Sequence, residues 1–132
     1  MTTTRSVERL SGVARRKTMR LTHYGRKSGK PYQVTIWFLV DGEKIYLMTM
    51  DMRRQWTQNV QKRPEVELEI GGERFRARVE SLVNDGAEMG HVVDLMKRKY
   101  PISRPYLWFK RRPDGAFRVK LENEATPAAS RT

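Results

Sequence analysis

Residues 18–50 read TMRLTHYGRKSGKPYQVTIWFLVDGEKIYLMTM, and this stretch does most to define the fold. Its first part, 18–23, alternates apolar and polar residues, while 32–40 and 44–50 are rich in β-branched and aromatic side chains. Both patterns are typical of β-strands. The Asp-Gly dipeptide at 41–42 is a strong signal for a tight hairpin turn. The stretch therefore predicts a three-stranded antiparallel meander.

The β-pattern continues further along the chain as a second hairpin. Residues 65–70 (EVELEI) alternate glutamates with apolar residues, and residues 74–82 (RFRARVESL) begin by alternating arginines with apolar residues. The glutamate row is expected to lie opposite the arginine row, where each cross-strand pair adds about 0.2–1 kcal/mol. A last alternating stretch, 116–122 (AFRVKLE), predicts a final strand.

Three segments carry helical patterns instead. Residues 5–17 place their apolar side chains on one face, residues 51–62 form a short helix before a proline, and a third helix begins at Asn84 or Asp85 as its cap. The first helix is expected to cover one end of a barrel, because its apolar face is small and Gly12 weakens it. Peripheral contact of this helix with a membrane surface remains an alternative.

Hairpins with few helices indicate a mainly β (α+β) domain of about six antiparallel strands with two or three flanking helices, as in a small barrel. A chain of 132 residues has room for one such domain, 1–132, with an N-terminal helical part over 1–17, a loop over 101–115 and a flexible tail over 123–132. No apolar run reaches membrane-spanning length and no secretory signal is recognisable, so a cytoplasmic protein is expected.

The net charge of +12 is distributed unevenly. Residues 1–31 and residues 97–120 each hold nine lysines or arginines and one acid, whereas residues 32–96 hold eight cations and eleven acids. Such asymmetry indicates an anionic partner, which could be nucleic acid, a membrane surface or an acidic small molecule. A nucleic-acid-binding module is the rival hypothesis, although the sequence shows no RNA-recognition, helix-turn-helix or zinc signature. With no cysteine and two histidines, the chain is expected to hold no metal.

The turn GRKSGKP (25–31) is the strongest candidate for an anion site. Its two glycines allow close backbone approach, Arg26 can bind a phosphate through two N–H groups, and Lys27, Ser28 and Lys30 add charge and a donor. It is not a nucleotide P-loop, because proline and a strand follow the Gly-Lys pair in place of Ser or Thr and a helix. No catalytic triad or carboxylate pair is recognisable, so the catalytic residues are unknown and a cofactor is expected to supply the chemistry.

Residues 22–50, followed by WTQNVQKRPEVELEIGG (56–72), resemble the deazaflavin-dependent nitroreductase family. The family pattern is a Gly-Arg-Lys-Ser/Thr-Gly-x-Pro turn, an Asp-Gly turn, a strand and Trp-Tyr-x-Asn-Leu. The resemblance implies a split β-barrel, often a homodimer, that binds coenzyme F420, an 8-hydroxy-5-deazaflavin. It further implies hydride transfer to an electron-poor small molecule such as a quinone, a nitro compound or an enone.

The resemblance also implies which positions bind the cofactor. The cations and the serine of the turn would lie at the cofactor phosphate, the strand around 37 and the strand end at 48–50 would border the ring, and the helix after 56 would close over it. The expected cofactor-binding residues are Arg26, Lys27, Ser28, Lys30, Trp37, Met48, Thr49, Met50, Trp56 and Asn59.

The chain departs from the family pattern at several positions. Tyr32 stands where the family has an arginine after the proline, Thr35 stands where it has a proline, and Asp51 brings a carboxylate to the strand end expected beside the cofactor. Two alternatives to an F420-dependent oxidoreductase are therefore retained: a split-barrel protein that binds FMN, and a cofactor carrier without catalytic activity.

Overall fold

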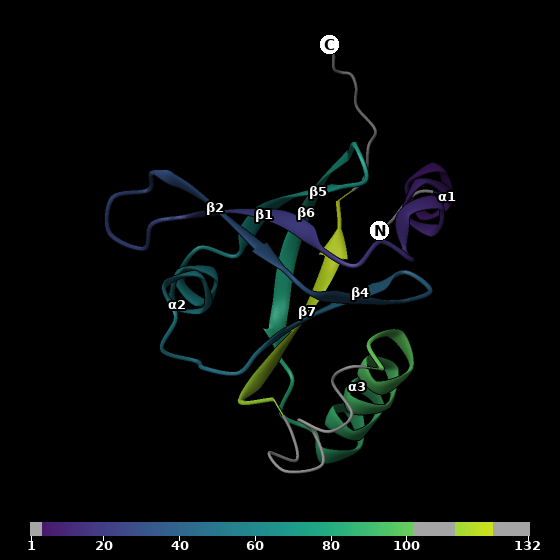
Figure 1. Cartoon of the computed structure of the whole chain (residues 1–132). Helices are drawn as coiled ribbons and strands as arrows, with labels where there is room; N and C mark the ends of the chain where they lie inside the picture. The colour runs from purple at the N-terminus through teal and green to yellow at the C-terminus, as the bar shows by residue number, and fades with distance from the viewer. Residues whose placement is uncertain (1–3, 102–112, 123–132) are drawn as a thin grey trace.

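One antiparallel sheet and three flanking helices make up the described part of the chain (Figure 1). The computed structural model describes residues 4–101 and 113–122, so the predictions for most of the loop 101–115 and for the tail 123–132 fall outside it. The elements, in chain order, are α1 (Thr4–Val13), β1 (Met19–Tyr24), β2 (Pro31–Ile36), β3 (Phe38–Asp41), β4 (Lys44–Thr49), α2 (Gln55–Lys62), β5 (Glu65–Ile70), β6 (Glu73–Leu82), α3 (Gly86–Lys99) and β7 (Gly115–Leu121).

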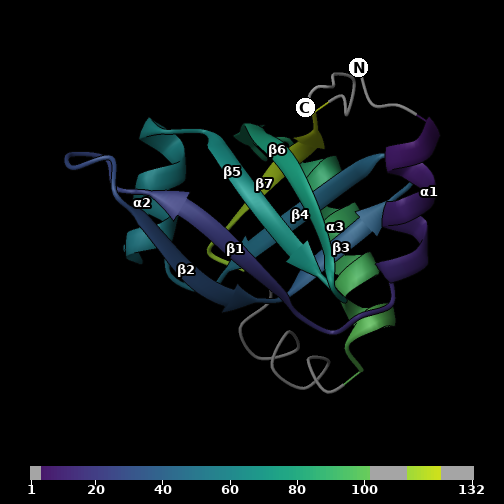
Figure 2. The ribbon, with the colours of Figure 1, turned by 90° about the horizontal axis from the view of Figure 1, so that it is seen from above.

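The order of the strands in the sheet is β2-β1-β5-β6-β7-β4-β3. The two edge strands, β2 and β3, are consecutive in the chain and are separated only by Trp37. The sheet therefore curls until both of its edges meet at one residue, which gives the curled barrel visible in Figures 1 and 2. This arrangement confirms the prediction of a mainly β split barrel.

The predicted meander was wrong in one respect. The expected strand 32–40 is divided at Trp37, so its first half pairs with β1 and its second half with β4, and the sheet has seven strands rather than about six. The sequence hid this break because Ile36, Trp37 and Phe38 are all apolar and aromatic or β-branched, which is also the pattern of an uninterrupted buried strand.

Side chains from the end of α3 hold the chain at this break. The Tyr100 hydroxyl accepts a hydrogen bond from Phe38 N–H (3.2 Å) and lies 3.0 Å from Phe38 O and 2.6 Å from Lys17 O. Lys99 Nζ donates to Phe38 O (2.9 Å) and Ala14 O (3.0 Å). The Trp37 ring stacks on Tyr100 with 4.1 Å between centroids. Burial raises the pKa of Tyr100 to about 12, so its hydroxyl stays protonated at neutral pH.

Replacing Tyr100 with phenylalanine is expected to lower the free energy of unfolding by about 1–3 kcal/mol, because Phe38 N–H then loses a buried acceptor. Urea unfolding followed by circular dichroism measures this loss. Tyr32→Phe is the matched control, since Tyr32 is 49% exposed and its loss of a hydroxyl should leave the unfolding midpoint nearly unchanged. Equal midpoints for Tyr100→Phe and the unmodified chain would contradict this role of Tyr100.

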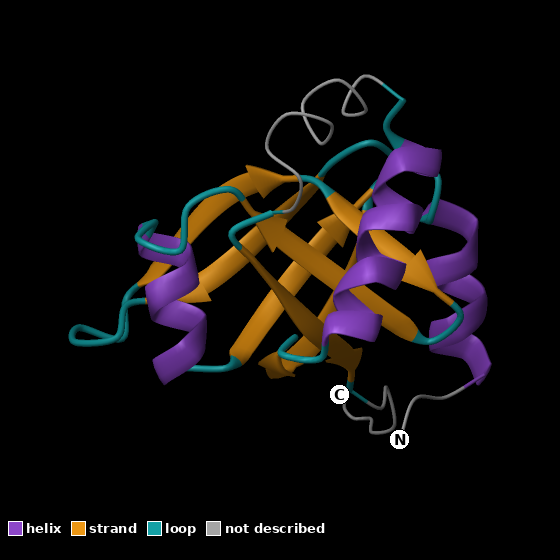
Figure 3. Ribbon diagram, turned by 90° about the horizontal axis from the view of Figure 1, so that it is seen from below, coloured by secondary structure: helices purple, strands orange, loops and turns teal. Residues whose placement is uncertain are grey.

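The core has two parts, one inside the barrel and one under α3. Inside, side chains such as Leu21, Phe38 and Phe117 are almost fully buried together with Leu10 of α1. The α1 helix thus covers part of the barrel, as predicted. Outside, α3 lies across the outer face of the sheet (Figure 3) and buries Val92 and neighbouring side chains against β3, β4 and β7. None of the described helices has the length and hydrophobicity needed to cross a membrane.

The β5–β6 hairpin has the predicted register. Each glutamate of β5 faces an arginine of β6, as in the pairs of Glu65 with Arg78 and Glu67 with Arg76, and the first of these is an ion pair. The predicted cap of α3 is also confirmed, since the carboxylate of Asp85 accepts a hydrogen bond from Ala87 N–H (2.8 Å).

Two helices are shorter than predicted. The α1 helix ends at Val13 rather than at residue 17, because the chain turns there and brings carbonyls to the Lys99 and Tyr100 side chains. The α2 helix begins at Gln55 rather than at residue 51. Before it, the chain forms a turn in which Thr49 Oγ1 donates to Asp51 O (2.9 Å) and accepts from Asp51 N–H (3.1 Å).

Candidate functional site

The loop between β1 and β2 is folded by its own hydrogen bonds. Gly25 N–H donates to Lys30 O (2.9 Å), Gly29 N–H donates to Gly25 O (2.8 Å), and Lys30 N–H donates to Ser28 Oγ (3.1 Å). Gly29 has a φ of 74°, which favours glycine. A Cβ atom on Gly25 would lie only 2.6 Å from Ser28 Oγ, so a larger residue there would displace the Ser28 hydroxyl from its place in the loop. Ser28 acts as an acceptor inside the loop and keeps its own O–H proton for a ligand.

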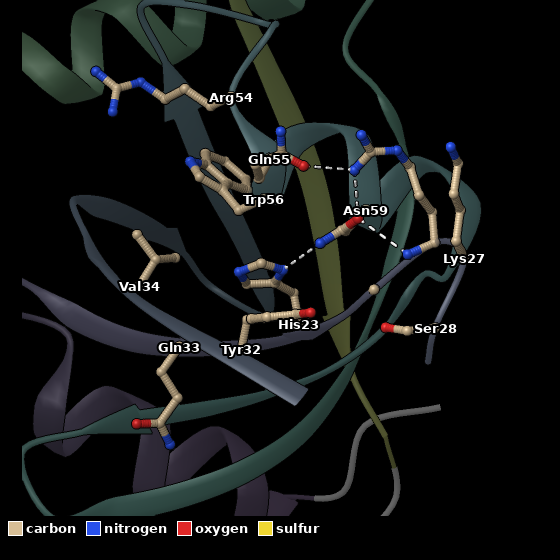
Figure 4. Close-up of a pocket in the computed structure, with 12 residues that line it drawn as sticks. His23, Lys27, Ser28, Tyr32, Gln33, Val34, Arg54, Gln55, Trp56 and Asn59 are labelled. Atoms are coloured by element: carbon tan, nitrogen blue, oxygen red, sulfur yellow. Dashed lines mark hydrogen bonds between the residues drawn. The ribbon is translucent and has the colours of Figure 1, made fainter. Parts of the chain in front are cut away.

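The α2 helix holds this loop through two amide side chains (Figure 4). Asn59 Oδ1 accepts hydrogen bonds from the backbone N–H of Arg26 (3.1 Å) and from Arg26 Nη1 (2.8 Å). Gln55 Oε1 accepts a further bond from Arg26 Nη1 (2.9 Å). Arg26 therefore lies at a fixed place, with its Nη2 and Nε groups available to an anion.

A buried histidine stands on the other side of Asn59. Asn59 Nδ2 lies 3.0 Å from His23 Nδ1, and both side chains belong to residues that are almost fully buried. The ring of Tyr32 stacks on His23 from the neighbouring strand, with 5.9 Å between centroids. Burial lowers the pKa of His23, which favours the neutral imidazole.

These residues surround a first cleft of about 630 Å³. Its walls carry Arg26, Lys27 and Arg54 but no carboxylate among the residues that line it, so its electrostatic character is positive. The described lining residues, all drawn in Figure 4, are His23, Gly25, Arg26, Lys27, Ser28, Tyr32, Gln33, Val34, Arg54, Gln55, Trp56 and Asn59.

A second cleft, of about 650 Å³, meets the first. Val34, Arg54 and Trp56 line both clefts, so Trp56 stands at their junction. The second cleft is mainly apolar and rich in methionine, whose flexible side chains adapt to ligands of irregular shape. Its lining residues are Val34, Thr35, Ile36, Trp37, Met48, Thr49, Met50, Arg54, Trp56 and Met96.

The two clefts together contain nine of the ten predicted cofactor-binding residues. The first cleft brings together Arg26, Lys27, Ser28, Trp56 and Asn59, and the second brings together Trp37, Met48, Thr49, Met50 and Trp56. Lys30 lines neither cleft. The backbone N–H and C=O groups of Lys30 both bond within the loop, so its backbone closes the turn.

Sequence reasoning missed other lining residues. Arg54 and Gln55 directly precede Trp56, and their place at the start of the same helix is a signal that could have found them. Met96 gave no such signal, because its neighbours in the site are distant in the chain. His23 lies just before the loop, but its bonding partner Asn59 is 36 residues away. The lining residues that were not among the predicted cofactor-binding residues are His23, Gly25, Tyr32, Gln33, Val34, Thr35, Ile36, Arg54, Gln55 and Met96.

The carboxylate of Asp51 is directed to its own turn rather than to either cleft. Asp51 Oδ1 accepts hydrogen bonds from Arg53 N–H (2.9 Å) and Arg53 Nε (3.0 Å), and Oδ2 accepts from Arg53 Nη2 (3.1 Å). The hydrogen bonds from the Arg53 side chain, which have the larger effect, and from the Arg53 backbone N–H hold the pKa of Asp51 below its usual value. The Asp51 carboxylate, which the sequence placed beside the cofactor, is thus paired with Arg53 and lines neither cleft.

The fold and the two clefts describe a site of a particular kind. In this split barrel a basic cleft and an apolar cleft meet at Trp56, an arrangement that suits a ligand with an anionic end and a planar apolar end. A family model for the F420H(2)-dependent quinone reductases matches residues 2–112, and the chain belongs to this family. It is therefore an F420-dependent oxidoreductase, and the resemblance seen in the sequence is confirmed.

Solved structures show the same fold at low identity. An F420-H2-dependent reductase (FDR-A) is 24% identical with a TM-score of 0.63, covering 80% of this chain and 95% of that chain. A structure described as an F420 reductase is 19% identical with a TM-score of 0.60, covering 86% and 92%. A third, described as a domain-swapped dimer, is 23% identical with a TM-score of 0.60, covering 81% of each chain. No curated protein matches the sequence significantly.

The donor groups of the site fit a deazaflavin cofactor that carries a phosphate. The first cleft offers cations, the Ser28 hydroxyl and the side-chain-free backbone of Gly25, which are the groups that recognise a phosphate. The second cleft offers apolar and aromatic walls such as Trp37 and Trp56, which suit a planar ring. No carboxylate lines either cleft to oppose the anion.

Proposed function

We propose that the chain holds reduced F420 across both clefts and uses it to reduce a quinone or a similar electron-poor small molecule. The observation that carries the proposal is the junction of a basic cleft and an apolar cleft at Trp56. A ligand with a phosphate at one end and an aromatic ring at the other can satisfy both environments at once. Family membership supports the cofactor and the class of acceptor.

In this proposal the basic loop binds the anionic end of the cofactor. Arg26 contributes Nη2 and Nε, Lys27 contributes charge, and Ser28 contributes its O–H donor. Asn59 and Gln55 keep Arg26 in place through the bonds to its Nη1 atom. A binding group that is already positioned loses less conformational entropy when the ligand arrives.

The apolar cleft orients the ring and the acceptor. When bound, the reduced deazaflavin supplies the hydride, and Trp37, Trp56, Met48 and Met50 form a wall that limits the access of water. Apart from Arg54, none of the described residues that line this cleft has an ionisable side chain. The proton that completes reduction of the acceptor therefore comes from solvent in this proposal.

We further propose that the chain functions as a homodimer. The edge strand β2 supports this, because its residues are exposed or only half-buried and Tyr32 is the most prominent exposed apolar side chain of the described residues. A similar structure described as a domain-swapped dimer supports it as well. Light scattering after size-exclusion chromatography is expected to give twice the mass of one chain, and a single-chain mass would exclude the dimer.

The experiment that tests the proposed function combines binding with turnover. Purified protein is titrated with oxidised F420 and, separately, with FMN at about 150 mM salt, and the quenching of fluorescence is followed. Oxidation of reduced F420 by a soluble quinone is then followed without oxygen. We expect tight binding of F420, weaker binding of FMN and quinone-dependent oxidation. Binding without turnover would indicate a carrier, and preference for FMN would contradict F420 as the ligand of the two clefts.

A further inference from the structure

The hydrogen bonds of Asn59 determine the proton position on His23. Asn59 Oδ1 faces two N–H groups of Arg26, at 3.1 Å and 2.8 Å, and neither of these can accept a hydrogen bond. The amide orientation is therefore fixed, and its NH₂ group must face His23 Nδ1 at 3.0 Å. Nδ1 has to act as the acceptor, so the proton of the neutral ring is on Nε2. Figure 4 shows that this second nitrogen points away from Asn59.

We propose that His23 is a positioning residue for cofactor binding: its neutral ring fixes Asn59, Asn59 fixes Arg26 and the loop 25–30, and protonation of His23 releases the loop. This inference rests on the proposed function for the identity of the ligand. The chain His23–Asn59–Arg26 links β1 and the loop that directly follows it to α2, whose Asn59 is 36 residues beyond His23.

Protonation places two donors against each other. With a proton on Nδ1, the imidazolium faces the NH₂ group of Asn59, and the amide can relieve this only by turning over. The turned amide then presents its NH₂ group to the N–H groups of Arg26, which have no acceptor there. The loop then loses its bonds to Asn59, so anion binding is weakened at low pH.

The surroundings of His23 determine how far the pH must fall before its ring is protonated. Arg26 and Lys27 from the loop and Arg54 from the start of α2 line the same cleft, and Tyr32 from β2 stacks on the ring. On the adjacent strand β5, the Glu67 carboxylate lies 3.4 Å from Tyr24 Oη and not at His23. Burial lowers the pKa of His23 from 6.5, and no carboxylate lines the cleft to compensate the imidazolium. The loop is therefore released only at a pH below that at which an ordinary histidine is protonated.

The first test is nuclear magnetic resonance of the histidine rings in the protein without cofactor. We expect His23 to carry its proton on Nε2 and to titrate below the range of an ordinary histidine. Asn59→Asp is expected to reverse the second property, because a carboxylate favours the imidazolium and raises the pKa of His23. A proton on Nδ1 at neutral pH, or no response of His23 to Asn59→Asp, would overturn the proposal. These readouts need no cofactor, so the proposal and the proposed function can fail separately.

The second test is the affinity for F420 between about pH 7.5 and about pH 5. In the unmodified chain the affinity is expected to fall by up to about tenfold per pH unit once His23 begins to protonate. His23→Gln keeps an acceptor for Asn59 Nδ2 but cannot titrate, so it should bind well at neutral pH and lose this dependence. Protonation of F420 itself affects the unmodified chain and His23→Gln equally, so it does not contribute to the difference between their pH dependences.

His91→Gln is the matched control for the second test. His91 is the other histidine of the chain, and its Nε2 lies 2.8 Å from Asp41 Oδ2, in an exposed pair that lines neither cleft. This variant should retain the pH dependence of the unmodified chain. Two results would overturn the proposal. One is the same dependence of F420 affinity on pH in His23→Gln and His91→Gln. The other is tighter binding at low pH in the unmodified chain alone, which would mean that the imidazolium binds the anion directly.

Discussion

Replacing Arg26 with alanine is expected to weaken F420 binding by about two orders of magnitude, or about 2–3 kcal/mol. The substitution removes the guanidinium that the proposed function places at the phosphate. It also removes the Nη1 donor that Asn59 Oδ1 and Gln55 Oε1 share, so the loop keeps only its backbone bond to Asn59. Losing the guanidinium and loosening the loop would both weaken the contact with the phosphate of F420. Fluorescence titration at about 150 mM salt measures the change.

Two further variants distinguish the direct contribution of Arg26 to F420 binding from the contribution of the protein's overall positive charge. Arg53→Ala removes the same charge, but Arg53 has a 91% exposed side chain, pairs with Asp51 and lines neither cleft, so little loss of affinity is expected. Arg26→Lys keeps the positive charge but lacks the planar guanidinium with its several N–H donors, so its affinity for F420 should lie between those of the two alanine variants. Equal losses for Arg26→Ala and Arg53→Ala would show that only net charge matters and would contradict the proposed site.

Replacing Trp56 with alanine is expected to lower the free energy of unfolding by about 3–5 kcal/mol. Trp56 is 5% exposed, belongs to the core inside the barrel and meets Phe117 edge to face at 5.8 Å between centroids. Removing the indole leaves a cavity that the strands can fill only in part. Because Trp56 also stands at the junction of the clefts, the variant should bind F420 weakly even where it remains folded.

The measurement is chemical unfolding followed by circular dichroism, with binding assayed at a temperature where the variant is folded. Trp56→Phe is the matched variant, since a smaller ring retains most of the apolar contact and should cost much less stability than alanine. A Trp56→Ala protein as stable as the unmodified chain would mean that the indole serves the ligand alone. That result would contradict its place in the core.

The predictable parts of the fold are those determined by neighbours in the sequence. The register of β5 with β6 follows from alternating charges on two segments joined by two glycines, and the start of α3 follows from the Asp85 cap. The break at Trp37 depends instead on Tyr100, which is 62 residues beyond Phe38 in the chain. No local pattern can report such a contact, so the division of one expected strand into two edges was missed.

The same distinction applies to the candidate site. Arg26, Lys27 and Ser28 could be predicted because glycines and cations crowd a single turn, and Trp56 and Asn59 because they follow at a recognisable spacing. His23 could not be predicted, since its significance depends on an amide that is 36 residues away and on the orientation of that amide. A lone histidine in a strand has the same appearance in the sequence whether it is packed passively or bonded to a functional loop.

The single residue between β2 and β3 has a consequence for how the chain can vary in length. Elsewhere, tight turns such as the one after β3 can accept an inserted residue, because a turn can absorb it without moving the strands. At Trp37 an insertion or deletion would have to be absorbed by one of the two edge strands, and a slip of one residue exchanges the inner and outer faces of that strand. Changes of chain length should therefore be accepted at the hairpin turns and rejected between Ile36 and Phe38.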